Sequence, residues 1–150
     1  GAGGSAGDGR GDRRGRRGVI ALDTNVLVRF LVQDDPAQGR AAAALIGGLA
    51  AEAPGWICRE VAVELVWVLE RAYRLTRAEI ADAVEALLEA RELRFEAEDR
   101  VGLAINRYRK GGPGFSDQMI LIAAGQAGRS GRCSFDRRLV QAGAVAVDGA

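Results

Sequence analysis

Four acidic residues lie at positions where their side chains could form a catalytic or metal-binding site. Asp23 directly follows a short apolar run, Asp136 follows a later candidate strand, Asp117 lies near a helix start, and Glu64 lies inside an apolar helical segment. Two carboxylates about 4 Å apart repel by roughly 4 kcal/mol at an effective dielectric of 20, so a group of four would take up protons or bind divalent cations. Ligands that are all oxygen favour Mg²⁺ or Mn²⁺, and such ions hydrolyse phosphodiesters.

Histidine is absent from all 150 residues. This excludes Ser-His-Asp and Cys-His catalysis, an HExxH zinc site and a ribonuclease that passes protons between imidazoles. The two cysteines, Cys58 and Cys133, lie far apart without a CxxC motif, which excludes a Cys/His zinc site and favours reduced core thiols. Any acid–base or metal chemistry must therefore come from carboxylates.

Three of the four carboxylates also have a purely structural interpretation. Asp23 and Asp136 each precede a predicted helix and would make ordinary N-caps. Asp117 lies in a first helical turn, where negative charge suits the helix dipole, and Ser116 is the better-placed cap there.

Glu64 lies in a segment, residues 61–69, in which eight of nine residues are apolar. A helix that is apolar on every side is expected to pack between other elements. Glutamate is seldom buried without a partner. A salt bridge to Arg71, seven positions on, and participation in a metal-binding cluster are both open interpretations.

Short strands alternate with helices along the chain. We expect strands at 19–22, 56–58, 93–95, 132–135 and 144–147, helices at 26–32, 36–50, 59–73, 77–89, 98–109 and 118–126, and a helical turn at 136–141. This alternation is typical of an α/β domain with a mostly parallel central sheet. Ligands collect at the carboxyl ends of such strands, where Asp23 and Asp136 are expected to lie.

The amino-terminal segment differs in composition from the rest. Residues 1–18 contain eight glycines, five arginines and no branched aliphatic or aromatic residue, so we expect a disordered Gly/Arg-rich tail. Residues 19–150 suit one domain, to which we assign the function. No apolar run is long enough to span a bilayer and the amino end does not look like a signal peptide, so a cytoplasmic protein without a membrane partner is expected.

Four segments in order resemble the PIN-domain family, specifically the VapC-like toxins of bacterial toxin–antitoxin pairs. The resemblance covers about residues 19–148. The matching segments read Ala-Leu-Asp-Thr-Asn-Val-Leu-Val-Arg at 21–29, Val-Glu-Leu-Val-Trp-Val-Leu at 63–69, Phe-Ser-Asp-Gln-Met-Ile-Leu-Ile-Ala-Ala at 115–124 and Ser-Phe-Asp-Arg-Arg-Leu at 134–139.

The resemblance implies a three-layer α/β/α fold and a divalent-metal-dependent endoribonuclease that leaves a 5′-phosphate and a 3′-hydroxyl. It assigns Mg²⁺ or Mn²⁺ to a catalytic and metal-binding set, with two supporting residues. Carried over by position, the set is Asp23, Glu64, Asp117 and Asp136, supported by Asn25 and Ser134. It further implies an RNA substrate, a homodimer and a cognate antitoxin protein, as in a type II toxin–antitoxin pair.

Basic residues near these motifs are candidates for RNA contact. Arg137 and Arg138 directly follow Asp136 and are the first candidates for binding phosphate, with Arg29 after them. A further basic group near the Gly-rich segment consists of Arg107, Arg109 and Lys110. Solvated helix ends are the alternative for each.

The same residues fit other functions less well or leave them open. A HAD-type phosphatase needs a second Asp two positions after Asp23, where this chain has Asn25, and the only lysine, Lys110, is poorly placed for it. A housekeeping RNA-processing PIN nuclease and a catalytically inactive PIN-like domain that binds RNA or protein remain as alternatives. Retention of all four carboxylates favours an enzyme.

Overall fold

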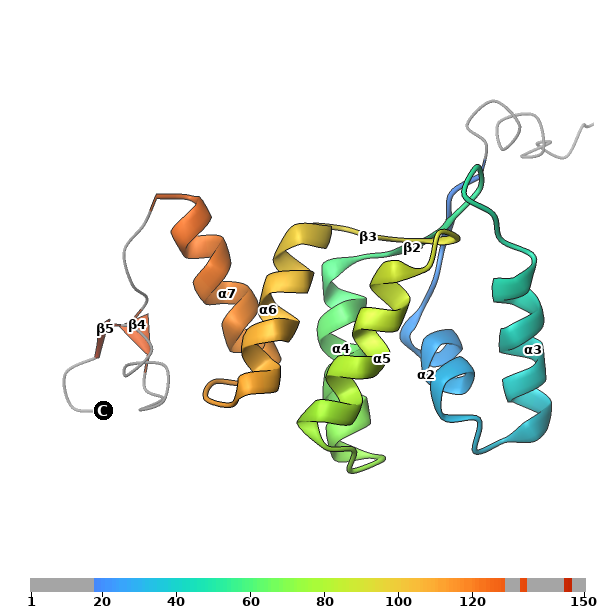
Figure 1. Cartoon of the computed structure of the whole chain (residues 1–150), viewed down its shortest axis with the longest axis horizontal. Helices are drawn as coiled ribbons and strands as arrows, with labels where there is room; N and C mark the ends of the chain where they lie inside the picture. Colours follow the sequence, from blue (N-terminus) through green and yellow to red (C-terminus); the bar gives the residue numbers. More distant parts are fainter. Residues whose placement is uncertain (1–17, 129–132, 135–144, 147–150) are drawn as a thin grey trace, which may run out of the picture.

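The computed structural model describes residues 18–128, 133–134 and 145–146 (Figure 1). Labels follow Figure 1. The helices are α2 (Thr24–Val32), α3 (Pro36–Gly47), α4 (Arg59–Arg71), α5 (Arg77–Glu89), α6 (Glu98–Lys110) and α7 (Phe115–Gln126), and the strands are β1 (Ile20–Ala21), β2 (Gly55–Ile57), β3 (Leu93–Phe95), β4 (Cys133–Ser134) and β5 (Val145–Ala146).

The strands pair in parallel, as the sequence predicts. One sheet has the order β1-β2-β3, with Ile20 opposite Gly55 and Gly55 opposite Leu93. The short strands β4 and β5 form a second parallel pair. Gly55 sits where the chain is tightly packed, because a Cβ there would lie 2.6 Å from Leu22 Cδ1 and 2.9 Å from Leu49 Cδ1. Glycine therefore allows β2 to lie between its neighbours.

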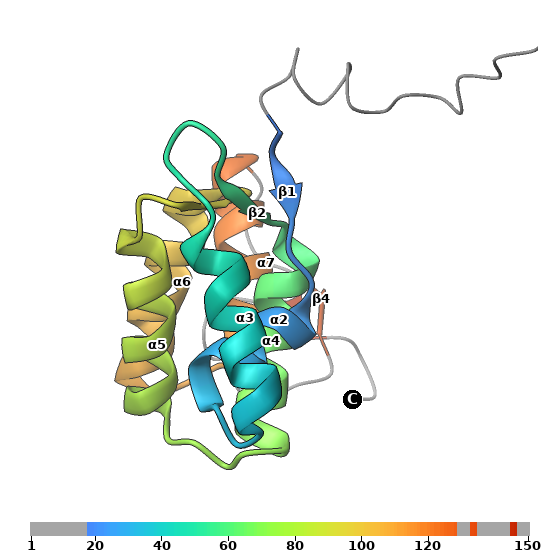
Figure 2. The ribbon, with the colours of Figure 1, turned by 90° about the vertical axis from the view of Figure 1, so that its right-hand side faces the viewer.

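Six helices and a three-stranded parallel sheet make up the described part of the chain, which agrees with the predicted three-layer α/β/α PIN-like fold. In Figures 1 and 2 the strands of this sheet lie toward one end of the helices. Because the strands are parallel, their carboxyl ends face the same way and lead into α2, α4 and α6. Among the described residues, no helix has the length and apolar character needed to cross a bilayer.

The core is built from one face of each of several helices together with the strand side chains. Helix α4 contributes Leu65 and Leu69, both without solvent exposure, and Ile57 of β2 is equally buried. Each fully buried aliphatic side chain of this kind stabilises the fold by about 1.5–3 kcal/mol relative to leaving it exposed. Helix α4 packs against α2, α5 and α7, so it is the central helix of the described part.

Local signals in the sequence place most helix ends correctly. Thr76 caps α5 with the reciprocal capping box expected from its Thr-Arg-Ala-Glu sequence, and α6 ends directly before Gly111. Asp23 and Asp35 cap α2 and α3 by accepting hydrogen bonds from backbone N–H groups. These caps satisfy donors that would otherwise be left open at each helix start.

The start of α7 differs from the prediction. The helix begins at Phe115, three residues earlier than expected, and its N-cap is Gly114, so the prediction of Ser116 as the cap is wrong. The reason lies in tertiary packing. Phe115 is buried and makes an edge-to-face contact with Tyr108 at 6.4 Å between ring centres, which draws it into the first helical turn.

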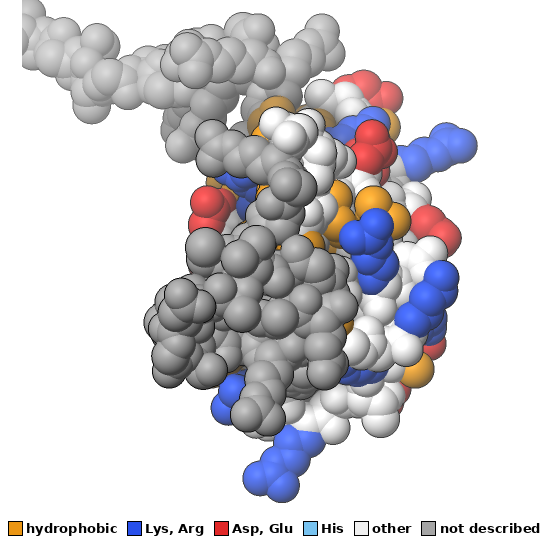
Figure 3. Space-filling view, turned by 90° about the vertical axis from the view of Figure 1, so that its left-hand side faces the viewer, with side chains coloured by type: hydrophobic (Ala, Val, Ile, Leu, Met, Phe, Trp, Pro, Cys, Tyr) orange, Lys and Arg blue, Asp and Glu red, His pale blue; other side chains and the backbone are white. Residues whose placement is uncertain are grey.

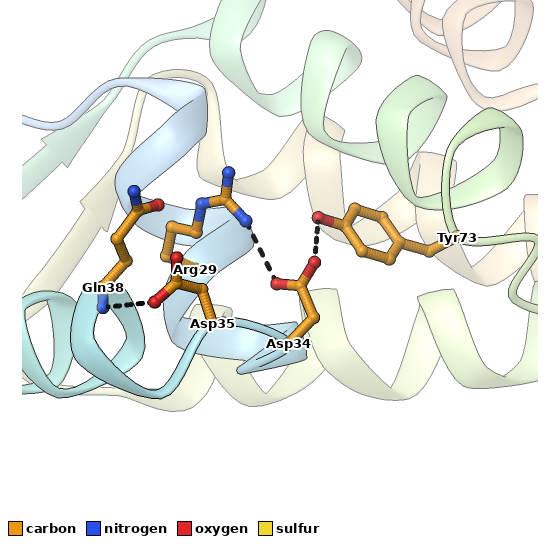
Figure 4. Close-up of polar contacts among 5 residues, drawn as sticks. All are labelled: Arg29, Asp34, Asp35, Gln38 and Tyr73. Atoms are coloured by element: carbon orange, nitrogen blue, oxygen red, sulfur yellow. Dashed lines mark hydrogen bonds and ion pairs between the residues drawn. The ribbon is translucent and has the colours of Figure 1, made fainter.

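A small polar network ties the α2–α3 connection to the end of α4 (Figure 4). Asp34 accepts a hydrogen bond from Arg29 Nη1 at 3.1 Å and another from the Tyr73 hydroxyl at 3.1 Å. Partial burial, reinforced by the hydrogen bond to Asp34, raises the pKa of Tyr73. Arg29, a candidate for RNA contact, therefore has a structural ion pair within the domain.

The capping box at α5 predicts a pH-dependent contribution to stability. The backbone N–H of Thr76, followed by its side chain, holds the pKa of Glu79 below the ordinary value of 4.5. A lowered folded-state pKa contributes stability that is present above the unfolded-state pKa and is lost as the pH falls through the folded-state value. The free energy of unfolding lost on Glu79→Ala, measured by urea titration, should be full at about pH 7 and should shrink as the pH falls below 4.5.

Glu89→Ala provides the control, because Glu89 is exposed at the other end of α5, where it caps nothing. It should lose less stability than Glu79→Ala at neutral pH. A loss on Glu79→Ala that stays constant down to strong acid would contradict an ionised cap.

Candidate functional site

One cavity joins two of the predicted carboxylates. It has a volume of about 390 Å³ and lies between α4 and the beginning of α7. Its polar lining residues are Glu64, Glu70 and Arg71 from α4 together with Ser116 and Asp117 from α7. Glu64 and Asp117 are 53 positions apart in sequence, so only the tertiary fold brings them to one cavity.

Glu64 is exposed, and the prediction that its helix is enclosed on every side is wrong. Helix α4 buries one face against its neighbours and leaves the face that carries Glu64 and Trp67 open to solvent. The alternative of a salt bridge to Arg71 is also not found, since no ion pair joins these two side chains within residues 18–128. The guanidinium carbon of Arg71 instead lies 5.9 Å from the centre of the Trp67 ring.

Asp117 is positioned by the glycine-rich turn that precedes α7. Gly111 and Gly112 have φ angles of +106° and +80°, which are accessible to glycine and strained for other residues. The chain therefore reverses sharply between α6 and α7, and Asp117 follows in the first helical turn beside α4.

Arg77 holds this turn in place. Its Nη1 donates to the carbonyl oxygens of Tyr108 at 3.0 Å and Pro113 at 3.4 Å, and its Nη2 donates to that of Gly112 at 2.9 Å. The guanidinium also lies 4.6 Å from the centre of the Tyr108 ring. One side chain of α5 thus satisfies carbonyls on both sides of the turn, and such charge-assisted hydrogen bonds are the stronger kind.

Tyr108 extends the same network to the cavity. Its ring is buried, and its hydroxyl donates to Glu70 Oε1 at 2.6 Å. Burial, reinforced by this hydrogen bond, raises the pKa of Tyr108, so the hydroxyl stays a donor at physiological pH. One oxygen of Glu70 is therefore engaged, and the orientation of this cavity carboxylate is set from the core.

Asp23 has the capping role that its position predicts. Its Oδ1 accepts a hydrogen bond from the backbone N–H of Val26 at 3.0 Å, at the carboxyl end of β1. It does not line the cavity of Glu64 and Asp117. Nearby, Asn25 lines a separate cavity of about 270 Å³ between α2 and α3.

A complete four-carboxylate cluster stays a prediction. Within the described ranges, no three Asp, Glu, Cys or His side chains lie close enough together to hold a metal ion. Asp136, the fourth proposed ligand, lies outside those ranges, as do Arg137 and Arg138. Ser134 ends β4, for which only the backbone is described.

Two of the basic residues considered for RNA contact, Arg29 and Arg109, have partners within the described part of the domain. Arg29 pairs with Asp34, and Arg109 donates to both Asp82 and Glu85 at 2.8 Å. Figure 3 shows basic and acidic side chains interspersed over the described surface of one face. This mixture agrees with the net charge of +1, which does not by itself indicate a nucleic-acid partner.

Residues 20–145 match the model of the PIN domain. The chain belongs to the PIN domain family. PIN domains are generally nucleases, and they generally use divalent metals. The match confirms the resemblance at the level of the family and leaves the narrower VapC-like assignment to be proposed. A comparison with curated proteins finds no match to this chain.

The oxygen donors of the cavity suit a hard divalent cation. Glu64 and Asp117 supply carboxylate oxygens from two different helices, and the described lining residues include no histidine or cysteine. Mg²⁺ and Mn²⁺ prefer such oxygen ligands, so the side chains present fit the metals that the family uses.

The sequence analysis did not predict a functional role for four residues at or near the cavity: Trp67, Glu70, Arg77 and Tyr108. Only Trp67 could have been predicted from the sequence. Trp67 and Arg71 lie three and seven positions after Glu64, so they share its helical face. The partners of Arg77 are 31 to 36 positions away in sequence, and no local pattern announces such contacts.

Removing the Arg77 side chain should loosen the turn before α7. Arg77→Ala deletes hydrogen bonds to three carbonyl oxygens and the contact with the Tyr108 ring. We expect a loss of about 2 kcal/mol in the free energy of unfolding, measured by urea titration. Amide hydrogen exchange should accelerate selectively in the turn and the first turn of α7.

Arg107→Ala is the matched control, because Arg107 is exposed on α6 and contacts neither the turn nor α5 through any described hydrogen bond. It should change stability by less than about 0.5 kcal/mol. Equal effects of the two substitutions would contradict a specific anchoring role for Arg77.

Proposed function

We propose that this PIN domain is a divalent-metal-dependent endoribonuclease that hydrolyses RNA phosphodiester bonds. The observation that carries the proposal is the shared cavity of Glu64 and Asp117 in a chain that belongs to a nuclease family. These two residues come from separate sequence motifs, 53 positions apart, and both supply carboxylates to the same cavity.

In the proposed site, Asp23, Glu64, Asp117 and Asp136 hold Mg²⁺ or Mn²⁺, with Asn25 and Ser134 in support. When bound, the metal activates water and stabilises the charge that develops on the phosphodiester. Glu64 and Asp117 supply anionic oxygens in the cavity, while the hydrogen bond from Tyr108 fixes Glu70 at its edge. Arg137 and Arg138, followed by Arg29, are proposed to contact RNA phosphates.

The metal mechanism predicts loss of cleavage when a ligand is neutralised. Glu64→Gln, Asp117→Asn and Asp23→Asn should each lower the cleavage rate of a panel of labelled RNAs by at least about 100-fold. Wild-type protein should cut with Mg²⁺ or Mn²⁺ and stop in EDTA, and the products should carry a 5′-phosphate.

Glu89→Gln, an exposed change on α5 that does not line the cavity, should cut at the wild-type rate. Glu64→Gln should also leave the metal-free protein as stable as the wild type or more stable, because it relieves repulsion between carboxylates. Undiminished cleavage in EDTA, or by correctly folded Glu64→Gln and Asp117→Asn variants, would overturn the metal mechanism.

We further propose that the protein is the toxin of a type II toxin–antitoxin pair, acts in the cytoplasm, and forms a homodimer that a small antitoxin neutralises. The support is the resemblance of the four motifs to VapC-like toxins. A housekeeping RNA-processing PIN nuclease is the competing assignment, and it requires no neutralising partner.

The toxin assignment predicts a growth phenotype that depends on catalysis. Induced expression of the wild-type chain in a bacterial host should arrest growth, and Glu64→Gln should not, although both accumulate as folded protein. Co-expression of a short DNA-binding protein encoded beside this gene should restore growth and co-purify with the chain. Normal growth under a wild-type protein that cuts RNA in vitro would favour the housekeeping role.

A further inference from the structure

Trp67 stays mostly exposed to solvent when the described residues pack together. Helix α4 buries Ala62, Leu65, Val66 and Leu69, yet 57% of Trp67 remains accessible to solvent even with the Arg71 guanidinium over its ring. An indole is among the largest apolar side chains, and leaving it in water forgoes the stabilisation that burial would give. The fold therefore gains little from tryptophan at this position.

The neighbours of Trp67 connect it to the carboxylate cavity. Trp67 lines the same cavity of about 390 Å³ as Glu64 and Asp117. Glu64, Trp67 and Arg71 follow one another at intervals of three and four positions, which places them in one row on the open face of α4. An aromatic surface and a guanidinium group thus stand directly beside the anionic oxygens.

This combination suits an unpaired nucleobase. A base stacks on an aromatic side chain through its π-face, and a guanidinium can stack with it or bind a phosphate oxygen. In a duplex the base faces are already stacked on one another, so only a single-stranded segment can offer a free face.

We propose that Trp67 and Arg71 form a base-binding subsite that stacks an unpaired base of RNA and holds the adjoining phosphodiester beside Glu64 and Asp117. The proposal rests on the proposed nuclease function for its choice of ligand. Docking of an apolar protein surface suits this place less well, because four charged side chains and the hydroxyl of Ser116 line the cavity alongside Val63, Val66 and Phe115.

The test measures binding of a fluorescein-labelled, unstructured single-stranded RNA by anisotropy, with the full chain in EDTA so that cleavage does not interfere. Trp67→Ala should weaken binding about tenfold. Trp67→Phe keeps an aromatic face and should retain most of the affinity, whereas Trp67→Leu keeps an apolar surface without one and should resemble Trp67→Ala. All three variants should melt within a few degrees of the wild type, since the side chain is mostly exposed.

The chain offers a matched control because its only other tryptophan, Trp56, lies in β2. In Trp56→Phe the sole indole is Trp67, and RNA should quench its fluorescence. In Trp67→Phe the sole indole is Trp56, and RNA should leave its fluorescence nearly unchanged. Arg71→Lys should weaken RNA binding, since a lysine ammonium lacks the planar face of guanidinium.

Several results would overturn the subsite. These are absence of RNA binding by the wild type, wild-type affinity in Trp67→Ala, and full affinity in Trp67→Leu. Loss of a dimer in Trp67→Ala without loss of RNA affinity would assign the face to a second copy of the chain. Trp67-dependent binding in EDTA without cleavage on adding Mg²⁺ would leave the subsite standing and overturn only the nuclease function.

Discussion

The contact between Arg77 and three carbonyl oxygens is the constraint on which the candidate site depends. The turn between α6 and α7 contains glycines with positive φ, and Arg77 donates hydrogen bonds to the carbonyl oxygens of Tyr108, Gly112 and Pro113. This guanidinium from α5 supplies them while its flat face rests on Tyr108. The path of the chain into α7, and with it the place of Asp117, follows from this single anchor.

Helix α4 serves both the core and the candidate site because its two faces are used differently. Its buried face fills the interior with aliphatic side chains, and its open face presents Glu64, Trp67 and Arg71 in a row. Trp67 on this face is 57% exposed, and the Arg71 guanidinium lies over its ring. In the proposed subsite this exposed ring stacks an RNA base, which connects membership of a nuclease family to a specific way of holding RNA.

Local sequence patterns predicted much of the fold, and the predictions that failed depend on contacts between residues remote in sequence. The strands and most helix ends follow from apolar runs, glycine and proline breaks, and the Thr76 capping box, whose energetics act within a few residues. The predictions for the start of α7 and for the environment of Glu64 were wrong. Phe115 joins the helix through its contact with Tyr108, and Glu64 lies on a face of α4 that the packing of α2, α5 and α7 leaves exposed.

The sequence by itself determined which side-chain types are available for chemistry in this protein. Because the chain has no histidine and no CxxC pair, carboxylates are its candidate reactive groups, and residues 20–145 match the PIN domain. Only the tertiary structure brought Glu64 and Asp117 to the lining of one cavity and showed that Asp23 caps α2. The donor atoms of each residue type set which ligand it prefers. The distances between residues remote in sequence depend on helix packing and on anchors such as Arg77, and no local sequence pattern specifies these distances.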